Sequence, residues 1–188
     1  MGKLYGGVFS MGNNKVTTKN GVNSNTALSL VQVAIMAAII YIATSIIHVP
    51  FISGEGVLHL GDSAIFVAAV LLGRKKGAVA GAIGMTLFDV LSPYIIWAPF
   101  TFIIKGSMAY IAGALAYRNG YEGKNFMNNF FAFVISGVVM IIGYFFAGWI
   151  IYDLPNAIVA IPSNALQVAA GMVIALPLAT QLKKHIKF

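Results

Sequence analysis

The chain has 188 residues, of which 59% are hydrophobic and only 9% are charged, and its net charge is +7. A soluble domain carries about a quarter charged residues, and so few charges cannot cover the surface of a water-soluble globule of this size. The composition therefore predicts a membrane protein. Because there is no cysteine, disulfides, thiolate metal sites and thiol catalysis are excluded.

Residues 1–26 are polar and rich in glycine and asparagine, which is atypical of a signal peptide. We predict that they form a flexible cytoplasmic tail in front of one membrane domain, 27–188. A membrane-spanning helix needs about 20 apolar residues, and fewer inside a bundle. The apolar stretches predict an all-α bundle of six transmembrane helices, at 27–47, 62–72, 77–91, 97–117, 126–151 and 162–182.

The charges are one-sided with respect to these six helices. Eleven of the twelve basic residues precede the first helix, join the second to the third or the fourth to the fifth, or follow the sixth: Lys3, Lys15, Lys19, Arg74, Lys75, Lys76, Arg118, Lys124, Lys183, Lys184 and Lys187. By the positive-inside rule that side is the cytoplasm, and both termini are expected there. This distribution favours a membrane topology over nucleic-acid binding as the reason for the basic charge.

Lys105 is the exception, in the apolar segment FTFIIKGSMAYI at 100–111. It lies about eight residues, or ~12 Å, inside its helix, and a central lysine costs roughly 2.5–3.5 kcal/mol to insert. One interpretation is a donor to a polar ligand in a cavity. The alternative is a side chain that snorkels outward or forms a structural ion pair. In either case Asp89 is the expected protein partner.

Other polar residues also have two interpretations. Asp62 is placed to cap the N-terminus of its helix or to contact a ligand. Asn164 and Gln167 follow Pro162 at the expected start of the last helix, and their spacing puts both amides on one face. That face either reads a heterocycle or makes hydrogen bonds between helices.

The aromatic residues Tyr94, Trp97, Tyr144 and Trp149 either stack on a flat ligand or form the interfacial aromatic belt. His59, in the segment HLGDS, joins the candidate ligand contacts. The histidines are too isolated for a metal site, so no metal or cofactor is predicted.

Motifs of enzymes are missing. The sequence has no GxxxxGK[ST], HExxH or GxSxG segment, which argues against ATP binding by this chain and against the corresponding hydrolases. Ala34 and Ala38 of the first helix lie one turn apart, a spacing that lets another helix approach closely. Gly77 and Gly81 make a similar pair, which we expect to pack inside this chain.

From Ala27 onward the sequence resembles the substrate-binding subunits, or S-components, of energy-coupling factor (ECF) vitamin transporters. The resemblance rests on six helices in fewer than 200 residues, on Ala34 and Ala38, and on the segments HLGDSAIFVAAVLLGRKKGAVAGAIG, FIIKG and IPSNALQ. Within that family the sequence is most similar to the group assigned to hydroxymethylpyrimidine or pyridoxine-like compounds.

The resemblance implies a subunit of the prokaryotic plasma membrane that binds a vitamin or precursor from outside. It implies no ATP hydrolysis by this chain, but assembly with a transmembrane coupling protein and two ABC-type ATPases. Ala34 and Ala38 would contact the coupling protein, and the loop after the first helix, with Gly54 and Gly56, would act as a lid. The alternatives are riboflavin or another vitamin as ligand, a solitary transporter, or a structural membrane subunit.

Overall fold

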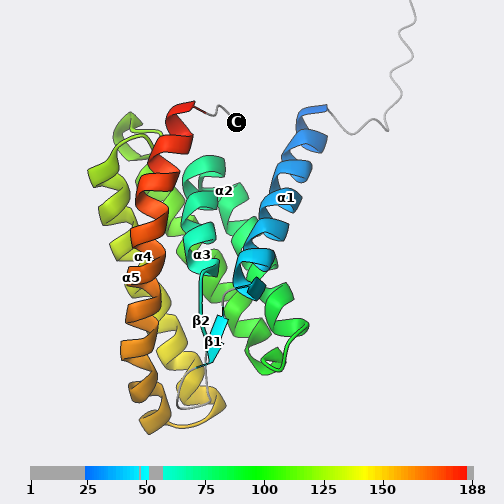
Figure 1. Ribbon diagram of the computed structural model, residues 1–188, viewed down its shortest axis with the longest axis vertical. Helices are drawn as coiled ribbons and strands as arrows, with labels where there is room; N and C mark the ends of the chain where they lie inside the picture. The colour runs from blue at the N-terminus through cyan, green and yellow to red at the C-terminus, as the bar shows by residue number, and fades with distance from the viewer. Residues whose placement is uncertain (1–23, 47, 51–56, 186–188) are drawn as a thin grey trace, which may run out of the picture.

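The computed structural model describes residues 24–46, 48–50 and 57–185. In these ranges the chain forms five α-helices and one small antiparallel hairpin (Figure 1). The elements are α1 (Ser24–Ile46), β1 (His48–Pro50), β2 (Val57–His59), α2 (Gly61–Val90), α3 (Ala98–Ala116), α4 (Phe126–Ile151) and α5 (Leu154–His185). Short 3-10 turns at Ile95–Trp97 and Arg118–Gly120 flank α3. The all-α prediction is confirmed; the expected lid residues Gly54 and Gly56 lie outside the described residues.

Helix α2 is a tight helical hairpin rather than one straight rod. Gly73 breaks it with φ 76° and ψ 177°, a conformation that favours glycine. Residues 69 and 77 would lie about 12 Å apart in a continuous helix, yet a Cβ added to Gly77 would sit 2.8 Å from the Ala69 Cα atom. Farther from the break, Gly81 lies against Ile65. The two halves are therefore antiparallel and correspond to the predicted helices 62–72 and 77–91.

In the part of the chain that the structure describes, four helical segments are long and apolar enough to cross a membrane: Thr26–Ile46, Ile95–Ala116, Phe126–Ile151 and Leu154–His185. Each half of α2 is shorter than these segments. Strand β2 directly precedes the first half of α2. The β1–β2 hairpin therefore lies along the bundle next to the start of that half (Figure 1). The protein is thus built from membrane-type helices, while six complete spans stay a prediction.

The predicted start of the last helix at Pro162 is wrong. Helix α5 begins at Leu154, where the Asp153 carboxylate accepts a hydrogen bond of 2.8 Å from the Asn156 backbone N–H. Pro162 and Pro177 both lie inside the helix. The apolar residues 154–161 continue the helix, and membrane helices tolerate an internal proline because their surroundings satisfy the freed backbone groups.

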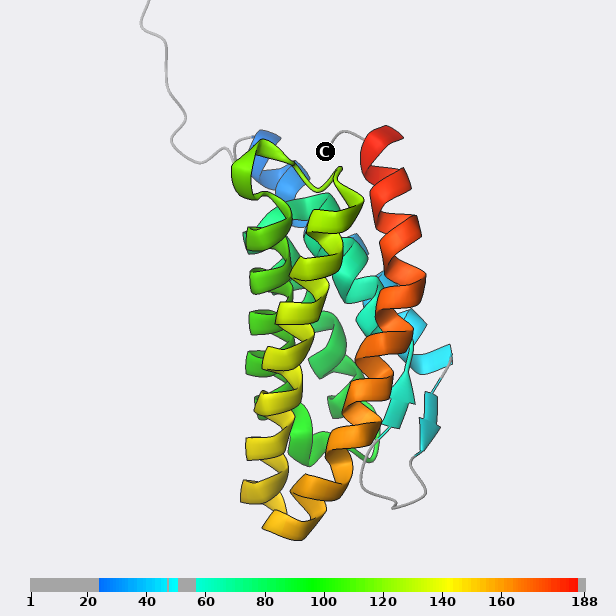
Figure 2. The same cartoon turned by 90° about the vertical axis from the view of Figure 1, so that its left-hand side faces the viewer.

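One end of the bundle gathers the basic joins. The α3–α4 connection, the start of α1 and the end of α5 all lie at this end (Figures 1 and 2). Lys183 donates a hydrogen bond of 3.1 Å to the Leu71 carbonyl, and Tyr117 donates one of 2.9 Å to the Val70 carbonyl. We name this the basic end. Its described basic residues match the predicted one-sided pattern, and its placement in the cytoplasm stays a prediction.

Close packing at glycine allows the α2 hairpin to form, and this generates a stability prediction. Gly77→Ala would place a methyl group 2.8 Å from backbone, at Ala69, which cannot move aside cheaply. We expect a loss of about 1–3 kcal/mol of stability from overpacking, seen as a lower melting temperature of the detergent-purified chain.

Gly106→Ala is the matched control, because its methyl group would come no closer than 3.3 Å to the Ala82 side chain and 3.8 Å to the Ala78 carbonyl. This substitution should leave the melting temperature unchanged or slightly raised, since alanine favours helix. Equal melting temperatures for the two variants would contradict the tight α2 hairpin.

Candidate functional site

A fully buried ion pair lies at the centre of the bundle. The Lys105 ammonium on α3 is 2.5 Å from an Asp62 carboxylate oxygen near the start of α2, and both side chains are 0% exposed. Lys105 therefore points into the bundle and does not snorkel. The prediction that Asp89 is the partner of Lys105 is wrong. The fold of the α2 hairpin brings the first turn of α2, which contains Asp62, against α3.

The second Asp62 oxygen is also occupied. It accepts a hydrogen bond of 2.8 Å from the side-chain amide of Gln167 on α5. The predicted N-cap role of Asp62 was wrong, since Leu60 holds the N-cap position and no side chain caps the helix. Gly171, one turn after Gln167, lets α2 approach α5, because its missing side chain leaves room for the Asp62 Cβ atom. Asp62 thus ties three helices together.

A tyrosine on α4 completes this arrangement. The Lys105 ammonium lies 5.1 Å from the centroid of the Tyr144 ring, within cation–π range. The Tyr144 hydroxyl is 3.1 Å from the Thr101 hydroxyl, one turn before Lys105 on α3. Sequence reasoning missed Thr101, although its i,i+4 spacing to Lys105 was a usable signal. We name Asp62, Thr101, Lys105, Tyr144 and Gln167 the polar cluster.

Asp89 lies beside this cluster with one oxygen unused. Its side chain is buried, and among the described residues its Oδ2 atom has no hydrogen-bond partner. The Asp89 carboxyl group is close enough to the Thr101 hydroxyl and to the Lys105 ammonium to interact electrostatically with both. A buried acceptor left unsatisfied costs about 1–3 kcal/mol, so this oxygen offers a position at which a donor from a ligand would be stabilising.

Trp149 is 49% exposed and lies against Phe145 and Phe146, and the other candidate aromatic residues divide into two groups. The Trp97 ring lies 5.9 Å from Tyr144, and therefore beside the polar cluster, and 5.9 Å from Tyr152. Tyr94 stacks at 6.2 Å on Phe88, whose ring is also 6.2 Å from that of His59. The nitrogen Nδ1 of His59 accepts a hydrogen bond of 3.2 Å from the Gly61 backbone, two residues on.

The structure thus brings four of the sequence-predicted site residues into direct contact and places Asp89 and Trp97 beside them: Asp62, Lys105, Tyr144 and Gln167. Tyr94 has a recorded contact with Phe88, and none with the polar cluster among the described residues. Asn164 is half-buried, and no hydrogen bond to it is recorded among the described residues, whereas Gln167 is buried in the polar cluster. The described residues contain no group of three or more His, Cys, Asp or Glu side chains that could hold a metal ion. The polar cluster and the rings beside it offer hydrogen bonding, ion pairing and stacking.

A separate apolar groove lies between α1 and the second half of α2. Ala34 and Ala38 are both exposed and line it, and its volume is about 660 Å³. The lining residues are Leu30, Val33, Ala34, Ala37, Ala38, Tyr41, Val79, Ile83, Leu87 and Leu91. Because both alanine side chains are small, they leave room for another helix to approach α1 closely.

The ion pair generates a test that does not depend on any ligand. Lys105→Met leaves the Asp62 carboxylate buried with Gln167 alone, and breaking a buried pair in this way typically costs about 3–5 kcal/mol. We expect a large fall in the melting temperature of the purified chain. Adding Asp62→Asn to Lys105→Met should restore much of the loss, because the uncompensated charge is removed. A double variant as unstable as the sum of the two single variants would contradict direct coupling.

Comparisons with known proteins agree with this architecture. A family model described as "ECF-type riboflavin transporter, S component" matches residues 24–184. An uncharacterized protein of Pyrococcus woesei is 31% identical over 145 residues, which cover 77% of this chain and 95% of that protein. A thiamine precursor transporter, HmpT, of Lactococcus lactis is 29% identical over 147 residues, 78% of this chain and 82% of that protein. Because the family model covers nearly all of the described helices, the chain is a membrane protein that belongs to the family of ECF-type transporter S-components.

Proposed function

We propose that this chain captures a small aromatic vitamin or precursor, of the hydroxymethylpyrimidine or pyridoxine type, from outside the cell. It then delivers the ligand inward together with a transmembrane coupling subunit and two ABC-type ATPases. The chain itself is no enzyme; ATP hydrolysis belongs to those partners. Membership of the S-component family and the similarity to a thiamine precursor transporter support this function.

The unused oxygen of Asp89 is the observation that carries the ligand assignment. Asp62 already holds Lys105 and Gln167, so its two oxygens are occupied. Asp89 is also buried, yet its Oδ2 atom has no partner among the described residues. An amino group on a pyrimidine or a hydroxyl group on a pyridine would donate to it, and the hydrogen bond to a charged group would contribute about 1.5–3 kcal/mol.

Stacking and charge fit the same ligand class. Trp97 and Tyr144 lie next to each other beside Lys105, and aromatic faces of this kind bind a single flat ring. Asn164 and Tyr94 would contact the ligand from α5 and from the join before α3, and His59 from the end of β2. One ammonium group, already paired with Asp62, suits a neutral ring better than a carboxylate or a phosphate.

The assembly that follows from this function has a definite orientation. With the basic end in the cytoplasm of a prokaryotic cell, both termini are inside and the α4–α5 connection faces outward. The coupling subunit would dock in the groove that Ala34 and Ala38 line, since that face of α1 is apolar, exposed and made partly of small side chains. The ligand would then bind at the polar cluster, and the coupling subunit would dock at the separate groove.

Riboflavin is the second candidate ligand, because the matching family model carries that vitamin in its description. Riboflavin is a three-ring compound, so it needs a longer flat site than a single pyrimidine. Titration calorimetry of the purified chain with hydroxymethylpyrimidine, pyridoxine and riboflavin separates the candidates. Tightest binding of riboflavin would replace the proposed ligand while keeping the subunit's role.

Asp89→Asn tests the ligand site separately from the fold. Because the Asp89 Oδ2 atom has no recorded protein partner, the melting temperature should hardly change. Affinity for hydroxymethylpyrimidine should fall about tenfold, the effect of weakening a charge-assisted hydrogen bond by about 1.4 kcal/mol. Titration calorimetry of the variant and of the wild type measures the two affinities.

The matched control is Asp153→Asn, which removes an exposed acidic charge at the same end of the bundle. Its affinity should equal that of the wild type. If Asp89→Asn bound every tested vitamin as tightly as the wild type, Asp89 would be removed from the site.

Ala34→Trp combined with Ala38→Trp tests the groove. Two bulky side chains should fill it, spare ligand binding, and reduce uptake into cells or vesicles that contain the complete transporter by at least about tenfold, because the complex fails to assemble. Ile35→Trp with Ile39→Trp is the control, since both isoleucines are exposed on α1 but do not line the groove. Normal uptake by the Ala34/Ala38 double variant would refute docking at this face.

A further inference from the structure

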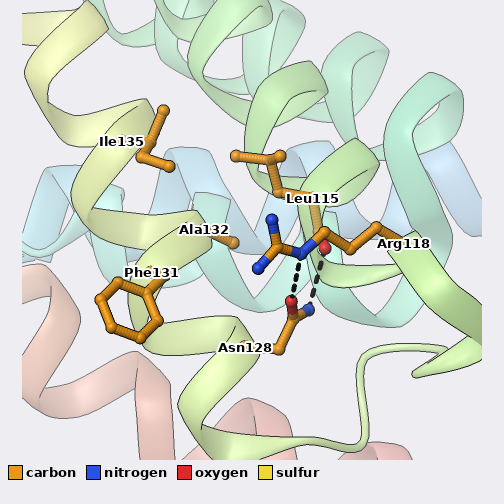
Figure 3. Close-up of a pocket in the computed structure, with 6 residues that line it drawn as sticks. All are labelled: Leu115, Arg118, Asn128, Phe131, Ala132 and Ile135. Carbon is orange, nitrogen blue, oxygen red and sulfur yellow. Dashed lines mark hydrogen bonds between the residues drawn. The ribbon is translucent and has the colours of Figure 1, made fainter.

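A second cleft lies at the basic end, between the end of α3 and the first turns of α4. Its volume is about 270 Å³. Leu115, Arg118, Asn128, Phe131, Ala132 and Ile135 line it (Figure 3). Residue 118 follows Lys105 by thirteen positions, which places this cleft about 20 Å along the α3 direction from the polar cluster. It is therefore not part of the proposed vitamin site.

The guanidinium group of Arg118 is held in a fixed position. Its Nε donates a hydrogen bond of 2.8 Å to the Asn128 side-chain oxygen. The Asn128 amide in turn donates to the Leu115 carbonyl at 2.8 Å and to the Ala116 carbonyl at 3.2 Å, and so ties the start of α4 to the end of α3. Asn128 is only 5% exposed, so this anchor is part of the packed structure.

The rest of the guanidinium group faces the cleft. Figure 3 shows its two terminal nitrogens on the side of Leu115 and Ala132, and among the described residues no hydrogen-bond partner is recorded for either. The acidic residue of this join, Glu122, is already paired with Lys124 at 2.6 Å. The positive end of the α4 dipole lies beside the same group. Charge and donors therefore both favour an anion at this position.

The wall of the cleft indicates what kind of molecule carries that anion. Phe131 is 50% exposed and Ile135 is 46% exposed, and both belong to the exposed apolar surface of α4, a helix long and apolar enough to cross a membrane. A free inorganic anion gains nothing from such a wall. A phospholipid fits both parts, with a phosphate on the guanidinium group and an acyl chain along α4.

We propose that this cleft is a binding site for an anionic phospholipid at the basic end of the bundle. Arg118 binds the headgroup phosphate through its two terminal nitrogens, Asn128 holds Arg118 in place, and Phe131 and Ile135 contact the acyl chain. The bound lipid would fasten the start of α4 to the end of α3 at the membrane surface. This site does not depend on which vitamin the chain binds.

The experiment compares two lipids with the same acyl chains on the purified full chain. Native mass spectrometry in detergent, with equal amounts of phosphatidylglycerol and phosphatidylcholine, should show preferential retention of phosphatidylglycerol. Arg118→Gln should weaken that retention about fivefold, the effect of losing one basic contact to an anionic lipid. Lys124→Gln removes the same charge from the same join, but its ammonium is paired with Glu122, and it should retain phosphatidylglycerol like the wild type.

Two further arms make the result decisive. Ile135→Trp keeps Arg118 but fills the cleft, so it should also lose the preference; it decides the question if Arg118→Gln fails to fold. Inorganic phosphate and glycerol 3-phosphate, added without phosphatidylglycerol, should not raise the melting temperature, whereas phosphatidylglycerol should. Equal loss in Arg118→Gln and Lys124→Gln, unchanged retention in both cleft variants, or stabilisation by free phosphate would each overturn the proposal.

Discussion

The buried pair of Lys105 and Asp62 is the constraint on which the rest of the structure depends. Neither charge is exposed, and two separated charges at this depth would each cost several kcal/mol. Their contact, the Gln167 amide and the Tyr144 ring satisfy them only when α2, α3, α4 and α5 meet at one point. The pair therefore adds little net stability, but it selects one arrangement of the helices over others that would pack the same apolar faces.

The α2 hairpin makes this meeting possible. The break at Gly73 and the close approach at Gly77 fold the helix back on itself. The first half of α2 starts near Asp62. The second half runs antiparallel to it and extends about one helical turn past Asp62, so that Asp89 lies near its end. Asp62 thus holds the bundle together, while Asp89 lies beside it with one oxygen that has no hydrogen-bond partner among the described residues. A binding site needs this combination of a satisfied frame and an unsatisfied group, since the ligand gains most where the protein leaves a donor or acceptor without a partner.

The two ends of the bundle have different chemistry. The end that holds Trp97 and Asp153 presents aromatic and acidic side chains, whereas the end that holds Arg118 and Lys183 is basic. Hydrogen bonds from side chains to the ends of helices, such as those of Asn128, hold the basic end together. Such bonds matter in a membrane, where water cannot satisfy the last carbonyls of a helix. They also hold Arg118 in place beside the cleft that Phe131 and Ile135 line.

The sequence by itself determined the membrane environment, the helical class, the bounds of α4 and the presence of an unusual charge inside a helix at Lys105, because hydrophobicity and charge act locally along the chain. It failed at Pro162, where local propensity was overruled by the apolar residues before it. Only the tertiary structure decided that Asp62 is the partner of Lys105, and that Thr101 and Gly171 belong with them. Which of two acidic residues reaches a buried ammonium depends on how far α2 folds back, and that distance is set by contacts between residues remote in the sequence, which no local pattern records.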